Sequence, residues 1–216
     1  MTLEGAFQYS PPTGPLRIVH EDRDMAVVDK PSGLLSVPGR VHADSVLSRL
    51  QERYPHVYAV HRLDMDTSGL LVVALRRKAE RELQRQFRER LVGKAYLAVV
   101  RGVVAEGEGE IDRPLSRVPG QPPRSVVDHA AGRSALTRYR VLERLGERTR
   151  LALMPRTGRS HQLRVHLYAI GHPIVGDRFY GPPTAPGQRL MLHAHTLSFL
   201  HPYDGRQILL EAVPPF

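Results

Sequence analysis

The chain has 216 residues, of which 41% are hydrophobic, so it is long enough to form one domain with a substantial core. It contains no cysteine, which excludes a disulfide framework and thiolate metal sites. It also lacks a signal-peptide pattern and an apolar run of the ~20 residues that a membrane span needs. We therefore expect a cytoplasmic protein. Its net charge of +9 favours a polyanionic partner, with RNA or DNA as the first candidate.

Apolar runs separated by turn-forming residues predict a chain made mostly of strands. Helices are expected after Asp44 as a cap, over residues 78–90, and after Ser160 as a second cap. The expected strands cover, by residue number, 16–20, 25–29, 70–75, 94–101, 133–145, 148–154, 190–200 and 207–213, with short strands near 111 and 126.

The order of these elements predicts a single α+β domain over residues 15–216, with a mixed, mostly antiparallel central sheet flanked by helices and loops. No linker rich in Pro or Gly separates two well-patterned halves of the chain. Residues 1–14 carry Pro and Gly and are expected to form a flexible arm.

The segment before the strand at residues 70–75 is the most informative part of the sequence. It reads His-Arg-Leu-Asp-Met-Asp-Thr-Ser-Gly over residues 61–69, with the turn-forming residues at its end. Asp64 would therefore lie on a loop that a buried strand holds in place, an arrangement typical of catalytic residues. The alternative is that Asp64 or Asp66 only caps the turn.

Residues 61–71 resemble the signature loop of the RluA-type pseudouridine synthases. Three further segments match this family: the Lys-Pro-x-Gly-Leu motif at 30–34, the Lys-x-Tyr motif at 94–96, and the Gly-Arg-x-His-Gln-Leu-Arg-x-His motif at 158–166. The resemblance covers roughly residues 15–216. It leaves no room for the separate S4-type RNA-binding module that some relatives carry.

The resemblance implies a catalytic site made of Asp64, Tyr96 and Arg164. Pseudouridine formation breaks the N-glycosidic bond of a uridine, turns the uracil and joins its C5 to C1′, without a cofactor or a metal ion. The resemblance implies that Arg164 pairs with Asp64, which would keep the carboxylate ionised, and that Tyr96 stacks on the uracil. Whether Asp64 adds to C1′, attacks C6 or removes the C2′ proton stays open, and we favour the elimination route through a glycal.

The target uridine must leave its stack to reach Asp64, which costs a few kcal/mol and is easiest in a loop. The resemblance implies that Arg62 fills the vacated space, and His61, Thr67, Arg159 and Gln162 are further candidates for RNA binding. It also implies that the substrate is a loop uridine in 23S ribosomal RNA, in the tRNA anticodon loop, or in both. We expect the protein to act as a monomer.

Other interpretations of the same residues are possible. Asp64, Asp66 and Thr67 resemble the Asp-x-Asp-x-Thr loop of haloacid-dehalogenase-type phosphatases, although Thr67 follows Asp66 directly and that loop follows an apolar strand without intervening residues. A non-catalytic RNA-binding protein of the same fold is a second alternative. The third is a metal site, since two imidazoles at 193 and 195 share one face of a strand, with His161 and His166 as possible further ligands.

Overall fold

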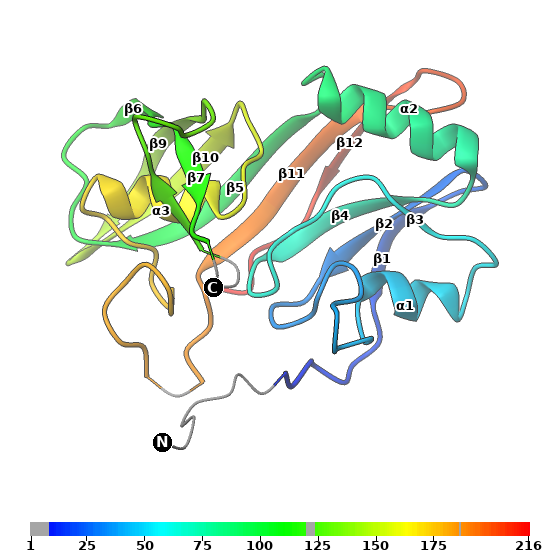
Figure 1. The fold of residues 1–216 in the computed structure, drawn as a ribbon, viewed down its shortest axis with the longest axis horizontal. Coiled ribbons are helices and arrows are strands. Elements are labelled where there is room, and N and C mark those ends of the chain that lie inside the picture. Colours follow the sequence, from blue (N-terminus) through cyan, green and yellow to red (C-terminus); the bar gives the residue numbers. More distant parts are fainter. Residues whose placement is uncertain (1–8, 120–123, 186) are drawn as a thin grey trace.

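The computed structural model describes residues 9–119, 124–185 and 187–216, which form a large twisted sheet with helices on its faces (Figure 1). Among these residues, no helix has the length and apolar character needed to cross a bilayer. The helices are α1 (Val46–Gln51), α2 (Arg77–Arg88) and α3 (Gln162–Ala169). The strands are β1 (Arg17–Glu21), β2 (Met25–Lys30), β3 (Tyr58–Ala59), β4 (Ser68–Ala74), β5 (Gly93–Arg101), β6 (Glu108–Asp112), β7 (Leu115–Arg117), β8 (Ser125–Val127), β9 (Leu136–Leu145), β10 (Arg148–Pro155), β11 (Leu192–Leu200) and β12 (Gln207–Glu211).

The central sheet has the order β1-β2-β4-β11-β5-β10-β9-β6, with β3 paired to β4 and β12 paired to β11. Its pairings are antiparallel apart from that between β4 and β11, so the predicted mixed, mostly antiparallel α+β fold is confirmed. Strands β7 and β8 form a separate two-stranded sheet. The predicted hairpin of β9 and β10 is also present.

The parallel junction of β4 and β11 is a seam between two antiparallel halves of the sheet. Its register joins His193 to Ser68 and Ala194 to Gly69. Gly69 has φ 107, and a Cβ at this position would lie 2.3 Å from the carbonyl oxygen of Ala194, so a side chain cannot be accommodated. Arg189 Nη2 donates to Ser68 Oγ over 2.6 Å, and Ser68 Oγ lies 2.8 Å from His193 Nδ1, which fastens the same seam with side chains.

Strands β2 and β4 are buried on both faces, which explains their continuous apolar sequences. Helix α2 packs Ala79 and Leu83 against one face in a cluster with Leu70 and Val72. Helix α1 packs against the opposite face in a cluster that contains Leu71 and Val73 (Figure 1). Helix α3 covers β5 and β10 in a third cluster. The loop before β4 is therefore anchored on a rigid strand.

Both helix caps expected from the sequence are wrong. The cap of α1 is Ser45, which forms a capping box with Ser48, whereas Asp44 pairs with Arg49. Helix α3 begins after His161, which has a left-handed backbone with φ 54 and makes no capping hydrogen bond through its side chain. The sequence cannot distinguish neighbouring polar residues as caps, because the choice depends on backbone angles set by the preceding loop.

The expected N-terminal arm lies partly outside the described residues, since these begin at Tyr9. Tyr9 donates to the carbonyl of Asp44 and accepts from the N–H of Leu35. Arg49 donates to the carbonyls of Pro12 and Gly14. Residues 9–14 are thus hydrogen-bonded to the domain, and flexibility stays a prediction for residues 1–8 alone.

Candidate active site

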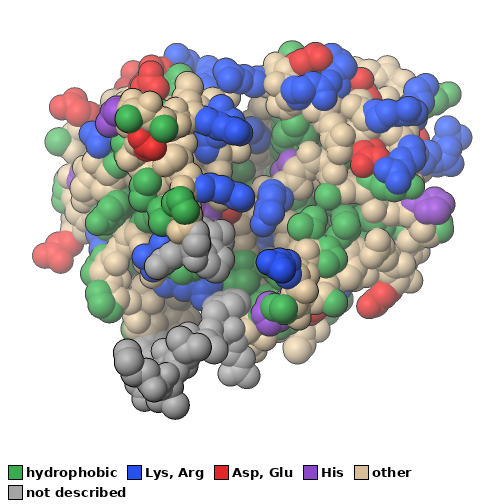
Figure 2. All heavy atoms as spheres, in the orientation of Figure 1, with side chains coloured by type: hydrophobic (Ala, Val, Ile, Leu, Met, Phe, Trp, Pro, Cys, Tyr) green, Lys and Arg blue, Asp and Glu red, His purple; other side chains and the backbone are tan. Residues whose placement is uncertain are grey.

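A cavity of about 1150 Å³ lies between the loop before β4, the starts of β5 and β9, the end of β10, and α3. Lys and Arg side chains gather on both rims of a hollow at the centre of the face shown in Figure 2. Among the described residues, Asp64 is the single carboxylate lining this cavity. The lining cations are Arg62, Arg88, Arg90, Lys94, Arg138, Arg156, Arg159 and Arg164.

Lys30 supports the loop that carries Asp64. Its side chain is fully buried, and its ammonium group donates to the carbonyls of Pro31, Leu34 and Met65 over 2.7–2.8 Å. Gly33 donates its N–H to the same Met65 carbonyl over 2.9 Å. Burial lowers the pKa of Lys30 to about 7, opposed by the charges of Asp66 and Asp64. Met65, which follows Asp64, is therefore held in place by both Lys30 and Gly33.

Two serines of the neighbouring segment hold the same loop. Ser32 donates to the carbonyl of Asp66 over 2.7 Å. Ser36 donates to the carbonyl of Leu63 over 2.7 Å and accepts the N–H of Leu63 over 3.0 Å. Residues on both sides of Asp64 are thus tied to the segment at 30–36, which gives that motif a structural role in positioning the loop.

The Asp64 carboxylate is surrounded by polar groups from the other side of the cavity. Its side chain is 25% exposed, and Oδ2 lies 3.5 Å from Nη1 of Arg164 and 3.8 Å from Nε2 of His161. The family resemblance implied that Arg164 pairs with Asp64, and this ion pair is present.

Arg164 has a second and closer partner, Asp177, that the sequence analysis missed. Nε and Nη2 of Arg164 donate to the two oxygens of Asp177 over 2.7 Å each, and both residues are buried. Burial alone would lower the pKa of Arg164, but the hydrogen bonds and charge of Asp177, with the charges of Asp64 and Asp66, raise it. Asp177 also accepts the N–H groups of Phe179 and Tyr180, so its own position is fixed. Arg164 is therefore a permanent cation.

Tyr96 lines the cavity from β5, on the far side of the sheet's seam from the loop that carries Asp64. Burial raises the pKa of its phenol, and the negative charge of Asp64 adds to the effect. The hydroxyl is consequently protonated at neutral pH. It can donate a hydrogen bond and its ring can contact a base, whereas a phenolate base is disfavoured.

The side chains of the five residues considered for RNA binding differ in their access to the cavity. Arg62 and Arg159 line it, and Nε of Arg159 donates to the carbonyl of Ser134 over 3.1 Å. Thr67 lines the cavity but is buried, and its N–H closes the turn by donating to the carbonyl of Asp64. The two arginines therefore remain the candidates with charge available to a phosphate.

Gln162 has no hydrogen-bonding capacity left for RNA. Its Oε1 accepts from Thr157 Oγ1 and from the N–H of Arg159, over 2.6 and 3.0 Å. Its Nε2 donates to the carbonyl of Leu136 and to Thr137 Oγ1, over 3.1 Å each. These four bonds use all its donors and acceptors, so Gln162 serves the protein's own groups here, and the expected RNA contact stays a prediction.

His61 is also engaged by the protein itself, and its RNA contact stays a prediction. Its Nε2 accepts the N–H of Val72 over 3.0 Å, and its ring stacks on Phe87 with centroids 4.4 Å apart. Burial, with a smaller effect from Lys94, lowers the pKa of His61 to about 3. The ring is neutral at physiological pH and its Nε2 serves the backbone of β4, which explains its fixed place beside the loop.

The four histidines considered as metal ligands do not converge among the described residues. His193 Nε2 and His195 Nδ1 both contact the carbonyl of Ala212, over 3.1 and 2.7 Å. His161 Nδ1 contacts Tyr180, and His166 contacts Thr137 and the carbonyl of Arg113. Each ring is thus engaged with a protein partner, and the two rings at Ala212 do not share a partner with His161 or His166.

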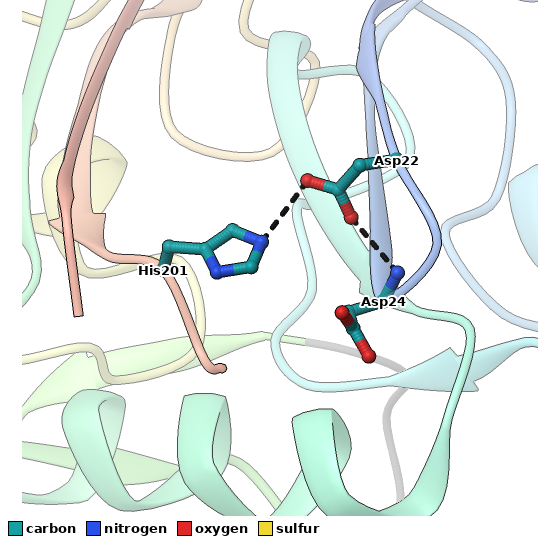
Figure 3. Close-up of side chains that lie close together, drawn as sticks. All are labelled: Asp22, Asp24 and His201. Atoms are coloured by element: carbon teal, nitrogen blue, oxygen red, sulfur yellow. Dashed lines mark hydrogen bonds and ion pairs between the residues drawn. The ribbon is translucent and has the colours of Figure 1, made fainter. Parts of the chain in front are cut away.

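A separate group of Asp22, Asp24 and His201 lies together between two turns (Figure 3). Asp22 Oδ1 accepts the N–H groups of Asp24 and Met25, while Oδ2 lies 3.1 Å from Nε2 of His201 and 3.1 Å from Nε2 of His20. These partners occupy both oxygens of Asp22. The group therefore joins the β1–β2 turn to the segment after β11, and we assign it no metal.

Sequence and structure comparisons place the chain among known proteins. A sequence model described as RNA pseudouridylate synthase matches residues 24–169. The dual-specificity RNA pseudouridine synthase RluA of Escherichia coli (strain K12) is 50% identical over 218 positions, covering 98% of the present chain and 100% of the relative. The enzyme of that name from Pasteurella multocida is 49% identical, with coverage of 96% and 98%.

Two solved human structures share the fold. Human RNA Pseudouridylate Synthase Domain Containing 1 superimposes with a TM-score of 0.82 at 34% identity, covering 96% of the present chain and 87% of the human one. Human RNA Pseudouridylate Synthase Domain Containing 4 superimposes with a TM-score of 0.76 at 26% identity, with coverage of 92% and 88%.

Proposed function

Because the chain belongs to the RNA pseudouridylate synthase family, we propose that it isomerises loop uridines to pseudouridine in 23S ribosomal RNA, in the tRNA anticodon loop, or in both, with Asp64 as the catalytic residue. The enzyme is an RNA pseudouridine synthase and hence an isomerase. The observation that supports the role of Asp64 best is its place as the single described carboxylate in a large cationic cavity.

The size and charge of the cavity support an RNA substrate. Its volume of about 1150 Å³ exceeds what a single small ligand fills, so it can take an extruded nucleotide together with its neighbours. Lysine and arginine side chains on its rim suit the phosphates that flank such a nucleotide. The base would leave its stack at a cost of a few kcal/mol, and Arg62 at the cavity mouth would fill the space left behind.

We assign the steps of the reaction as follows. Asp64, ionised beside Arg164, acts on the ribose or base as the N1–C1′ bond breaks, and a glycal formed by loss of the C2′ proton is our preferred intermediate. The uracil turns against Tyr96, and its C5 bonds to C1′ while Asp64 returns the proton to C2′. The C5 proton then passes to Asp64, which is ionised again, and N1 takes up a proton from water, so that no proton is gained or lost overall. The protonated phenol of Tyr96 is available to bond the base during this exchange.

The RNA contacts follow from the accessible side chains. Arg62 and Arg159 would bind phosphates or stack on bases, whereas His61, Thr67 and Gln162 would shape the cavity wall that the base meets. We infer that residues 15–216 act as one catalytic unit and as a monomer, without a metal or a cofactor. An enzyme that modifies these RNAs works in the cytoplasm.

Tritium release from uridine labelled at C5 tests the proposal. The wild-type protein is incubated separately with a 23S ribosomal RNA transcript and a tRNA transcript, with Asp64→Ala alongside. We expect release with at least one wild-type reaction and none with Asp64→Ala, although Asp64→Ala still binds the RNA. Tight binding without release from either RNA would overturn the catalytic proposal and favour a non-catalytic RNA-binding protein.

A further inference from the structure

His161 occupies a backbone conformation that is unusual for its residue type. Its φ is 54, in the left-handed region, immediately before α3. Non-glycine residues in this region are uncommon and cluster at functional sites, where the surrounding structure holds them in place. Its side chain is buried and lines the cavity, with Nε2 toward the carboxylate of Asp64. The conformation therefore brings an imidazole to the reacting group.

The ring of His161 is oriented by a chain of two hydrogen bonds. Tyr180 Oη accepts the N–H of Ser125 over 2.7 Å and lies 2.9 Å from Nδ1 of His161. Nε2 of His161 also lies 3.5 Å from Nη1 of Arg164. Because a guanidinium only donates, that contact would need the proton on Nδ1, whereas donation of the Tyr180 hydrogen to Nδ1 puts the proton on Nε2. We assign the second tautomer, because it leaves no hydroxyl hydrogen without an acceptor and because the contact with Nη1 is longer than an ordinary protein hydrogen bond. Stacking on Phe179, with an interplanar angle of 13°, fixes the plane of the ring.

Two donors therefore approach the same oxygen of Asp64. Nε2 of His161 lies 3.8 Å and Nη1 of Arg164 3.5 Å from Oδ2. We propose that His161 is a positioning residue which, with Arg164, holds Oδ2 of Asp64 so that Oδ1 faces the ribose of the extruded uridine. This assignment rests on the proposed function, because it concerns the orientation of the catalytic carboxylate.

Charge and distance are compatible with this role. Burial lowers the pKa of His161 against the opposing charge of Asp64, so the ring stays neutral and does not compete with Arg164 for the ionic contact. Catalytic hydrogen bonds are often long before the substrate is bound and tighten when it excludes water. An uncontrolled rotation of the carboxylate would misplace Oδ1 by an ångström or more, and such misplacement can cost ~10²-fold in rate.

Replacing His161 by Gly and by Asn separates the effect of losing the imidazole ring from the effect of the left-handed backbone. Glycine adopts φ 54 without strain but removes the imidazole. Asparagine is the side chain that best tolerates this region and still carries an N–H donor. We expect kcat to fall at least ~10-fold in His161→Gly and less in His161→Asn, while KM and RNA affinity stay within about twofold of wild type.

The matched control is His166→Gln, on the same helix, since His166 is buried and contacts Thr137 and the carbonyl of Arg113 instead of Asp64. It should lower thermal stability and leave kcat unchanged. Tyr180→Phe provides a second test, because it frees the ring to adopt either tautomer while keeping the aromatic packing. We expect a severalfold loss of kcat at constant KM.

The rate of the wild-type protein distinguishes failure of the proposed function from failure of the positioning role of His161. Tritium release by wild type establishes the reaction, and the ratio of each variant to wild type then tests His161 alone. A kcat in His161→Gly or Tyr180→Phe within twofold of wild type would overturn the positioning role. So would a loss of rate matched by an equal loss of RNA affinity, or an equal loss of kcat in His166→Gln.

Discussion

Arg164 meets Asp64 with the one guanidinium nitrogen that Asp177 leaves free. Nη1 lies 3.5 Å from Asp64 Oδ2, whereas Nε and Nη2 are each bound to Asp177 over 2.7 Å. The arginine is 2% exposed, so it cannot swing away when the cavity fills with RNA. Its charge is supplied to Asp64 from a fixed place, and the residue that fixes it lies outside the cavity lining.

Asp177→Asn should therefore impair both stability and catalysis. The buried Arg164 would keep its charge but lose the closer of its two ionic partners, and breaking a buried ion pair in this way typically costs about 3–5 kcal/mol. We expect a large fall in the denaturant midpoint and a slower single-turnover release of tritium. Glu110→Gln, which removes an exposed partner of Arg138, should cost less than ~1 kcal/mol. Equal stability of the two variants would contradict the anchoring role.

Lys30→Met tests the support beneath the loop that carries Asp64. Loss of the ammonium group leaves the carbonyls of Pro31 and Leu34 without this donor, at about 1–3 kcal/mol each, and leaves the carbonyl of Met65 with the N–H of Gly33 alone. We expect a destabilisation of ~3 kcal/mol in urea unfolding and a loss of kcat, because Met65 adjoins Asp64. The exposed Lys78→Met should lie within ~0.5 kcal/mol of wild type. A fully active Lys30→Met would show that the loop holds its shape unaided.

The stability of the protein should depend on His61 at acidic pH. The pKa of His61 is lowered from 6.5 to about 3 in the folded state, so the unfolded state binds more protons between these values. The free energy of unfolding then falls as the pH is lowered from about 6.5 toward 3, by up to ~1.4 kcal/mol per pH unit for this group. Urea unfolding at several pH values should show a shallower slope for His61→Gln. The exposed His56→Gln should keep the wild-type slope.

Arg62→Ala should weaken RNA binding and turnover without changing folding. The side chain is exposed at the cavity mouth, so its removal disturbs no buried partner. If Arg62 contacts a phosphate, the slope of log affinity against log salt should decrease by about 1. Arg148→Ala, an exposed arginine at the far end of β10, is the matched control for general charge. Identical affinity and rate for the two variants would remove Arg62 from the proposed site.

Much of the fold could be predicted from local sequence. Strands β2 and β4 were recognisable because burial on both faces demands continuous apolar residues, and α2 because its apolar residues recur on one face. The motif resemblance brought Asp64, Tyr96 and Arg164 together as candidates, and all three line one cavity.

The remaining parts of the site depend on contacts that no local pattern encodes. Asp177 lies 13 residues from Arg164, and Lys30 lies 35 residues from Met65. A polar partner that lies this many residues away along the chain cannot be recognised from the local sequence pattern. The internal hydrogen bonds of Gln162 could not be predicted for a related reason, since a polar residue in a motif can serve the protein's own groups as well as a ligand. Buried hydrogen-bond partners decide between the two.

The parallel seam between β4 and β11 has a consequence for the thermal inactivation of the enzyme. Asp64 precedes β4, whereas Tyr96 and Arg164 belong to elements beyond β11, and the backbone register that joins the two sides comprises two residue pairs. Warming should loosen this short junction before the long ladders on either side. We therefore expect heat to abolish activity while most of the secondary structure persists. The highest temperature at which the enzyme works is then set by the stability of the β4–β11 pairing.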